Sequence, residues 1–315
     1  MKNSSKTSSP RHSAYAANCD VLFALFPLAF MAIYLYGLRP AVMLFAAGVT
    51  ATLCDRLVAL LRSQPYDKTE NSSVVYAVIF TLMLPASLPY SMVITGVVVA
   101  ILIGKHAFGG WGNYPFNPAA VGYAVVTVCW SDSLFRYPVP FAPLGIFSAS
   151  GAALVEASAH TLKAGGIPNI AMWDLLLGSY AGPMGTTFCL VIAASAVFLL
   201  VRHRISLELP VSFLLTCMVV SLLMPRVAMA NSLALMKYEL LSGALLYSSV
   251  FLVCNTNTAP KNTYARILYG ILCGFLCMMF RHYGAYELGV CFAVLLGNAF
   301  SGYFDRICSA SSAPA

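Results

Sequence analysis

The stretch that decides the fold runs from Lys105 to Tyr123 and reads K-H-A-F-G-G-W-G-N-Y-P-F-N-P-A-A-V-G-Y. It is rich in Gly, Pro and Asn, although long apolar segments flank it on both sides. Gly109, Gly110 and Gly112 can adopt positive φ angles and allow other groups to approach closely, because they carry no Cβ. The stretch therefore predicts irregular backbone between two membrane helices.

Prolines and asparagines complete this broken-helix motif. Pro115 and Pro118 lack an N–H and keep the preceding residue out of the α region, whereas Asn113 and Asn117 can bond open backbone groups. In a membrane, irregular backbone persists only where protein or a polar cavity satisfies it. We expect the segment to be buried as a re-entrant or broken-helix junction, with an ordinary interhelical loop as the alternative. The motif residues are Gly109, Gly110, Gly112, Phe116, Asn117 and Pro118.

The composition is that of an integral membrane protein. Of 315 residues, 60% are hydrophobic and 9% are charged, whereas soluble domains carry about 25% charged residues. Residues 1–18 are polar, Ser-rich and basic without an apolar core, which predicts a disordered cytoplasmic tail rather than a signal peptide. The net charge of +7 reports orientation in a membrane protein and does not indicate nucleic acid as a partner.

Ten apolar segments approach the length that a transmembrane helix needs, which predicts an all-α membrane protein with about ten transmembrane helices. A double-proline corner at Pro85 and Pro89 separates the third from the fourth. The segments are 19–36, 41–61, 74–88, 92–104, 117–130, 186–201, 209–224, 240–254, 267–280 and 286–303.

The ten spans divide into two five-helix repeat halves of one polytopic membrane domain, 19–304. The halves cover about 19–130 and 186–303, joined by an outer-face loop at 131–185, and 305–315 forms a short cytoplasmic C-terminus. Interrupted segments at matching places in two halves point to a site at the repeat interface. We expect 255–260 to be the counterpart of 105–118.

The basic residues set the orientation. With an inner N-terminus, twelve of the 18 Lys and Arg residues fall on inner segments, which follows the positive-inside rule. Both termini are then cytoplasmic, and the loop 131–185 lies on the outer side. It contains an apolar segment, 146–162, and we expect it to fold back over the outer face with an amphipathic or partly inserted helix.

Cysteine and histidine patterns predict neither a metal site nor catalytic residues. The ten cysteines include no C-x-x-C, and most lie inside apolar runs, where Cys behaves as a small hydrophobe. We expect the scattered histidines to be interfacial. They are His12, His106, His160, His203 and His282.

Carboxylates are also expected at the membrane edge. Asp20 and Asp55 are predicted to be interfacial, Asp55 with Arg62 nearby, and Glu287 is predicted to pair with Arg281. No carboxylate is placed clearly at mid-membrane, so the sequence predicts no ion relay within the chain.

The amino-acid sequences of three segments resemble those of one known family. The F-G-G-x-G-x-x-P-F-N-P-A motif resembles that of the D subunit of Rnf-type electron transport complexes, to which a membrane component of the sodium-translocating NADH:quinone reductase is homologous. The family usually has Asn where this chain has Tyr114. The run from Arg281 to Asn298 and the pair Asp305-Arg306 also resemble this family. The resemblance implies a ten-helix fold of two halves in a bacterial inner membrane.

The resemblance also implies a flavin. In the family, an S-[GT]-A-T segment after the fifth helix carries FMN on its threonine at the outer face, and the matching position here is Ala153. Alanine has no hydroxyl and cannot form the phosphoester, so FMN is expected to be noncovalent or absent. Thr186 and Thr187 could hold a phosphate or cap a helix. The candidate cofactor-binding residues are Ser150, Gly151, Ala152, Ala153, Thr186 and Thr187.

Two functions follow from the resemblance. The first is a D-type subunit that works with other membrane and peripheral subunits and couples ferredoxin/NAD-type electron transfer to Na⁺ or H⁺ movement. Such a subunit would have no stand-alone catalysis. The second is a transporter or channel of the same fold without a redox role, which the loss of the acceptor hydroxyl at Ala153 favours.

Overall fold

The computed structural model shows an almost entirely helical protein. It describes residues 10–66, 70–147, 153–156, 166, 170–225, 232–241, 244–284, 286 and 288–310. Within these ranges, four helices are long and apolar enough to cross a membrane and four more are apolar but shorter. The predicted all-α membrane fold is confirmed.

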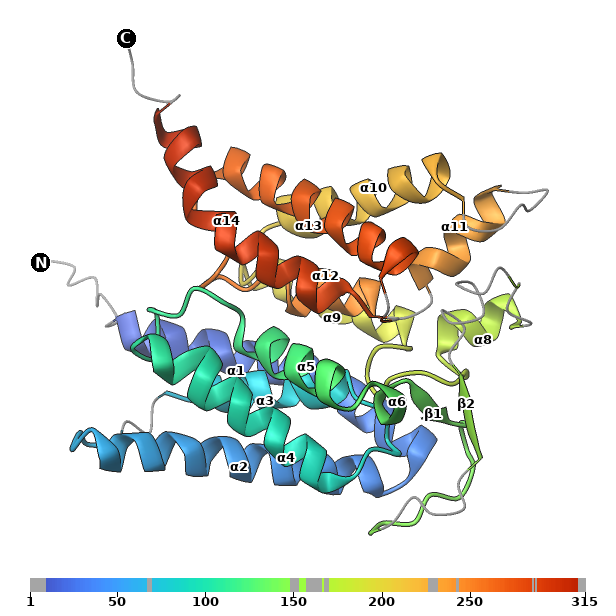
Figure 1. Cartoon of the computed structure of the whole chain (residues 1–315), viewed down its shortest axis with the longest axis horizontal. Helices are drawn as coiled ribbons and strands as arrows, with labels where there is room; N and C mark the ends of the chain where they lie inside the picture. The colour runs from blue at the N-terminus through green and yellow to red at the C-terminus, as the bar shows by residue number, and fades with distance from the viewer. Residues whose placement is uncertain are drawn as a thin grey trace, which may run out of the picture.

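The first half of the chain forms one layer of the molecule and the second half forms the other (Figure 1). The first layer contains α1 (Pro10–Tyr36), α2 (Arg39–Leu61), α3 (Ser72–Leu82), α4 (Tyr90–Val99) with its π-helical extension η1 (Ala100–Lys105), the turn η2 (His106–Phe108), α5 (Pro118–Cys129) and α6 (Ser131–Leu134). After α8 (Met172–Leu177), the second contains α9 (Cys189–Val201), α10 (Glu208–Leu223), α11 (Ser232–Leu241), α12 (Leu245–Phe251), α13 (Thr263–Tyr283) and α14 (Val290–Ala310).

Helix packing repeats between the layers. In the first, α4 packs against α2 and α5, and in the second α13 packs against α10 and α14. Across the layers, α1 contacts α9 and α5 contacts α14. The start of α1 and the end of α14 lie at one end of the bundle, which we call the terminal end, whereas α9 begins at the opposite, loop end (Figure 1). The two layers therefore run in opposite directions, as in inverted repeats.

The third helix of each layer is broken. At a rise of 1.5 Å per residue, α3 and α12 span about 16 and about 10 Å, too little for a bilayer core of about 30 Å. The predicted continuous helices over 74–88 and 240–254 are therefore wrong, because α3 ends at Leu82 and the second segment divides into α11 and α12. The carbonyls of Leu82 and Leu84 accept hydrogen bonds from the backbone N–H of Gly185 and Met184, at 2.8 and 3.0 Å. These contacts satisfy buried backbone in the way a membrane requires.

A buried arginine holds the double-proline corner in place. Arg39 is 2% exposed, and its Nε and Nη2 donate to the carbonyls of Ala86 and Leu88, at 2.6 and 3.0 Å. Its Nη1 donates to the carbonyl of Gly145 at 3.1 Å, and its guanidinium lies 4.9 Å from the centre of the Tyr90 ring. One side chain thus ties the corner and the following loop to the start of α2.

The loop end also carries a small sheet. Strands β1 (Arg136–Pro138) and β2 (Leu154–Glu156) pair antiparallel, with Tyr137 opposite Val155. The predicted apolar segment 146–162 is described only at 146–147 and 153–156, and the strand β2 there contradicts a helix in that part. The described helix α8 lies further along the loop.

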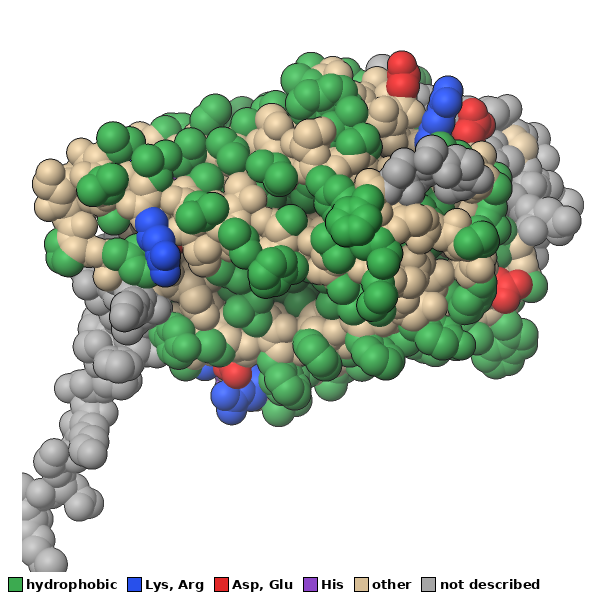
Figure 2. Space-filling model, turned by 90° about the horizontal axis from the view of Figure 1, so that it is seen from below, with side chains coloured by type: hydrophobic (Ala, Val, Ile, Leu, Met, Phe, Trp, Pro, Cys, Tyr) green, Lys and Arg blue, Asp and Glu red, His purple; other side chains and the backbone are tan. Residues whose placement is uncertain are grey.

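The molecular surface fits a lipid environment. Figure 2 shows a face dominated by hydrophobic side chains, with few charged groups. Large apolar side chains such as Phe26, Phe45 and Leu60 are 69%, 74% and 76% exposed. Exposed apolar surface of this extent is unusual for soluble proteins, which rarely present large contiguous patches.

Candidate functional site

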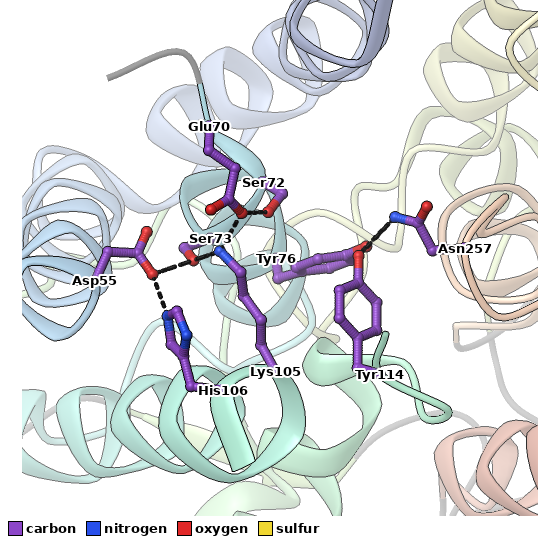
Figure 3. Close-up of polar contacts among 9 residues, drawn as sticks. All are labelled: Asp55, Glu70, Ser72, Ser73, Tyr76, Lys105, His106, Tyr114 and Asn257. Atoms are coloured by element: carbon purple, nitrogen blue, oxygen red, sulfur yellow. Dashed lines mark hydrogen bonds and ion pairs between the residues drawn. The ribbon is translucent and has the colours of Figure 1, made fainter. Parts of the chain in front are cut away.

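A buried lysine is the centre of the most polar region among the described residues. Lys105 is the last residue of η1, and its side chain is 0% exposed. Its Nζ donates to Ser73 Oγ at 2.6 Å, lies 3.4 Å from Asp55 Oδ1 and forms an ion pair with Glu70 (Figure 3). Together with His106, these side chains are called the terminal cluster: Asp55, Glu70, Ser73, Lys105 and His106.

Three segments of the first layer supply these groups. Asp55 comes from the last turns of α2, and it accepts a hydrogen bond from Ser73 Oγ at 2.8 Å and contacts His106 Nε2 at 2.7 Å. Glu70 precedes α3 and accepts a hydrogen bond from Ser72 Oγ at 2.7 Å. A buried charge is costly unless it is paired and hydrogen-bonded, and here each buried charge has such partners.

A cavity of 530 Å³ lies beside the cluster. Its lining includes Asp55, Glu70 and His106 together with residues from the first turns of α1, so it lies at the terminal end. Arg62 Nη2 donates to the His106 carbonyl at 2.6 Å, which ties the end of α2 to the turn after η1. The other lining residues are Ala14, Tyr15, Asn18, Val58, Ala59, Arg62, Gln64, Pro65, Tyr66, Gly109, Gly110 and Trp111.

A second polar network joins the broken-helix motif to the other layer. The hydroxyls of Tyr76 and Tyr114 lie 2.6 Å apart, and Asn257 Nδ2 donates to Tyr114 OH at 2.6 Å (Figure 3). Burial, followed by the neighbouring Tyr76, raises the pKa of Tyr114 well above its usual value. Asn117 is the N-cap of α5, because its Oδ1 accepts a hydrogen bond from Ala119 N at 3.0 Å. Its Nδ2 donates to the Leu252 carbonyl at 3.1 Å.

The segment 255–260 is a contact partner of the motif, and the prediction that it is the repeat counterpart of the motif is wrong. It follows α12, the third helix of its half, whereas the motif follows the fourth helix of the first half. The topological counterpart of Lys105 and His106 is Arg281 and His282, at the end of α13.

The motif adopts the backbone that its glycines allow. Gly109, Gly110 and Gly112 have φ angles of 109°, 90° and 80°, and Pro118 begins α5. The expectation that the whole segment is buried is wrong, since residues 107–109 and 111–113 are exposed. The buried part contains Tyr114 and 117–120, and the side chains of Tyr114 and Asn117 form hydrogen bonds to the other layer.

The terminal cluster brings ionisable side chains of both signs together. Two carboxylates surround one lysine, so the cluster carries one excess negative charge when His106 is neutral and none when it is protonated. Among the described residues, no group of three or more His, Cys, Asp or Glu side chains is arranged to hold a metal ion.

The predicted cofactor residues divide between described and undescribed positions. Ser150, Gly151 and Ala152 lie outside the described residues. Ala153 is exposed, and its carbonyl accepts a hydrogen bond from Val139 N at 3.2 Å.

Neither predicted threonine is the N-cap of α9, because the helix begins at Cys189 with Phe188 as its cap. The side-chain oxygens of Thr186 and Thr187 are buried and have no hydrogen-bond partner within the described part of the chain. They are enclosed by protein in this arrangement, so they do not present an open phosphate site.

Sequence reasoning missed the terminal cluster because it treated its members one at a time. Asp55 was predicted to be interfacial with Arg62 nearby, but it is 7% exposed and contacts Lys105 and His106. The signal was its position inside the predicted span 41–61, where an ionisable residue marks a functional site. Arg281 contacts Glu239, and its predicted partner Glu287 lies outside the described residues.

Comparison with known proteins identifies the family. A profile of the NQR2, RnfD, RnfE family matches residues 3–313. The D subunit of the ion-translocating oxidoreductase complex of Escherichia coli O81 (strain ED1a) is 29% identical over 310 residues, covering 88% of each chain. The protein of the same name from Escherichia coli (strain K12) is 28% identical with the same coverage. The chain therefore belongs to the NQR2, RnfD, RnfE family of membrane subunits of ion-translocating oxidoreductase complexes.

Proposed function

We propose that this chain is the D subunit of an Rnf-like complex that couples ferredoxin/NAD-type electron transfer to Na⁺ or H⁺ translocation. The observation that carries the proposal is the match of nearly the whole chain, residues 3–313, to the family. In this proposal the chain lies in a bacterial inner membrane, and the excess of basic residues on one set of segments supports an orientation with the terminal end toward the cytoplasm.

The chain works only with partners in this proposal. Its sequence contains no nicotinamide-binding or iron–sulfur motif, so the electron carriers must come from sister membrane and peripheral subunits. Its apolar outer surface offers contact area for lipid and for such subunits. The broken-helix motif contributes by joining the two layers through Tyr114 and Asn117.

Covalent FMN does not fit the residues present. At Ala153 a methyl group stands where the phosphoester needs a hydroxyl oxygen, and the oxygens of Thr186 and Thr187 are enclosed. Any FMN at the outer face is therefore held noncovalently in this proposal. When bound, the flavin would pass electrons, and this chain would hold it near the β1–β2 sheet.

Purification from a host that carries the neighbouring genes tests the subunit assignment. We expect iron–sulfur and flavin-binding subunits to co-purify with the tagged chain. On denaturation the chain itself should release its flavin and show no in-gel flavin fluorescence, because no covalent bond holds the cofactor. A chain that purifies alone from this host would contradict the proposal.

Ala153→Thr is the matched variant. With the family's flavin transferase co-expressed, we expect this variant to gain an FMN adduct that mass spectrometry detects, because it restores the missing hydroxyl. Ala142→Thr, in the same loop but outside the motif, is the control and should gain no adduct. An unmodified Ala153→Thr chain would mean that the surrounding pocket no longer accepts the flavin.

A transporter or channel without a redox role is the second candidate, because Ala153 cannot bind flavin covalently. It predicts a colourless protein whose neighbouring genes encode no iron–sulfur or flavin-binding subunits. Flavin absorbance and the gene neighbourhood therefore separate the two functions.

A further inference from the structure

A second buried ion pair lies at the loop end of the bundle. Arg281 and Glu239 are 3% and 2% exposed. Arg281 Nη1 lies 3.4 Å from Glu239 Oε2 and donates to the Glu239 carbonyl at 2.8 Å. The following residue, His282, contacts the carbonyl oxygens of Met278 and Met224 through its two ring nitrogens, at 2.7 and 2.9 Å. We call Glu239, Arg281 and His282 the loop-end clamp.

The clamp occupies the place in the second half that the terminal cluster occupies in the first. Lys105 and Arg281 both lie in the last turn of the fourth helix of their half, and a histidine follows each. Their carboxylate partners both precede the buried part of the third helix: Glu70 lies just before α3, and Glu239 lies in α11, before α12. Each histidine also contacts the second helix of its half. His106 contacts Asp55 within α2, and His282 contacts the carbonyl of Met224, the residue that follows α10.

The two sites differ in access. The terminal cluster borders a cavity of 530 Å³, whereas the void beside Arg281, lined also by Cys277 and Leu288, has no room for a water molecule. In the terminal cluster two carboxylates contact one lysine, whereas in the clamp the described ion pair joins one carboxylate to one arginine. Among the described residues, the terminal cluster therefore borders open space, whereas the void beside the clamp admits no water.

We propose that the Glu239–Arg281 ion pair is the loop-end gate of a cation path that begins at the terminal cluster. A monovalent cation, H⁺ or Na⁺, opens the gate by taking the place of Arg281 on the Glu239 carboxylate. The inference deepens the proposed function, on whose coupling ion it rests. Inverted repeats place equivalent groups at opposite ends of the molecule, which is the arrangement that alternate opening requires. Ionisable groups are also costly within a membrane, so their presence there marks a functional site.

The groups around Glu239 define what else could respond to pH. Arg281 and Cys277 face it from α13, and Cys217 on α10 interacts electrostatically with both Glu239 and Arg281. His282 lies at the end of α13, and Lys237 and Tyr238 are neighbours on α11. Both nitrogens of His282 face carbonyl oxygens, which accept only, so both contacts are hydrogen bonds only when the ring is protonated. A pH experiment therefore needs a background in which this histidine cannot titrate.

Native cysteines report the state of the gate. Cys277 lines the closed void and is 0% exposed, whereas Cys129 at the end of α5 is exposed. The full chain in membrane vesicles would be treated with a small, charged methanethiosulfonate reagent, and both thiols quantified by mass spectrometry. The ratio of Cys277 labelling to Cys129 labelling corrects for the effects of reagent concentration and pH on the labelling reaction.

We expect Glu239→Gln to raise this ratio about tenfold, because Arg281 loses the charge of the Glu239 carboxylate. The double variant Glu239→Arg, Arg281→Glu should return the ratio toward the wild-type value, which shows that the pair and not the fold was disturbed. Unchanged labelling in Glu239→Gln, or a double variant that labels as fast as the single, overturns the gate.

Two further arms identify the cation in the His282→Asn background. Labelling that rises with Na⁺ replacing choline at fixed pH assigns Na⁺, and labelling that rises as pH falls in choline assigns H⁺; Glu239→Gln should abolish either response. A response to neither cation overturns Glu239 as the site. Thiol labelling does not need electron transfer, so a failure of the redox assignment is visible separately, in the co-purification experiment.

Discussion

The two ends of the molecule carry equivalent charged groups in unlike surroundings. At the terminal end, Lys105 contacts two carboxylates, and Glu70 keeps 26% of its side chain exposed beside the cavity. At the loop end, Arg281 and Glu239 are enclosed. The comparison shows that the two halves of the chain place charged groups at equivalent positions but expose them to water to different extents. Hydration, and not charge alone, therefore distinguishes the open end from the closed one.

Removing the basic side chain from each site gives the largest expected effect. Arg281→Met should lower the free energy of unfolding by about 3–5 kcal/mol, because Glu239 loses its cation in a site without space for water. Lys105→Met should cost less, about 3 kcal/mol, since cavity water and His106 still solvate the two carboxylates. Equilibrium unfolding in mixed detergent micelles measures both.

Lys261→Met is the control for these two variants, because Lys261 is an exposed lysine at the terminal end and its loss should change the unfolding free energy little. Equal losses for Arg281→Met and Lys105→Met would remove the proposed difference in hydration between the two ends.

The contact between layers near the terminal end is the next test. Tyr114→Phe removes a buried hydroxyl that contacts both Tyr76 OH and Asn257 Nδ2, at 2.6 Å each. It should lower the free energy of unfolding by about 1–3 kcal/mol, because those groups lose a buried partner. Tyr264→Phe, on a residue that is 73% exposed, should be neutral in the same assay. A neutral Tyr114→Phe would mean that this network does not hold the layers together.

Helix contacts within the second layer should give an effect of similar or smaller size. A Cβ at Gly274 of α13 would lie 2.7 Å from the Phe213 carbonyl oxygen of α10, which cannot move aside easily. Gly274→Ala should therefore destabilise by about 1–3 kcal/mol. Gly48→Ala, where nothing lies within 4 Å, should be neutral or slightly stabilising. If both variants unfold alike, α10 and α13 are not packed as closely as described.

The smallest effect is expected at the surface of the terminal end. Asp20 of α1 contacts Arg202 and Arg204 beyond α9, at 3.0 and 2.6 Å. Arg202 is about half exposed, so water and salt screen its attraction to the Asp20 carboxylate. Asp20→Asn should cost about 0.2–1 kcal/mol and less at high salt. A loss as large as that of Lys105→Met would show that exposure of the basic partners, 53% for Arg202 and 0% for Lys105, does not separate these sites.

Sequence patterns predicted the helical membrane class and the broken-helix motif because these depend on local chemistry. Apolar length marks α1, α2 and α13, and the glycines with positive φ lie where Gly109, Gly110 and Gly112 were recognised. The broken third helices were missed because Leu82 and Leu84 find their partners about 100 residues away, at Met184 and Gly185. A hydropathy profile cannot predict these hydrogen bonds between distant parts of the chain.

The ion pairs were harder to predict, because each joins residues from different helices. Lys105 was counted as an inner charge and Glu239 was not singled out, since the partner of each lies far away in the sequence. Comparing the residues that end equivalent helices would have found the Lys105-His106 and Arg281-His282 pairs. The flavin region remains a prediction, because Ser150, Gly151 and Ala152 lie outside the described residues.

The two short helices, α3 and α12, have an electrostatic consequence. Both stop inside the protein, where Leu82 and Leu252 are 0% exposed, and they approach from opposite directions. The C-terminal end of a helix carries a partial negative charge, and lipid does not screen it as water would. The Gly185 N–H on the Leu82 carbonyl and the Asn117 amide on the Leu252 carbonyl therefore do more than complete hydrogen bonds: they also offset the negative charge of these two helix ends.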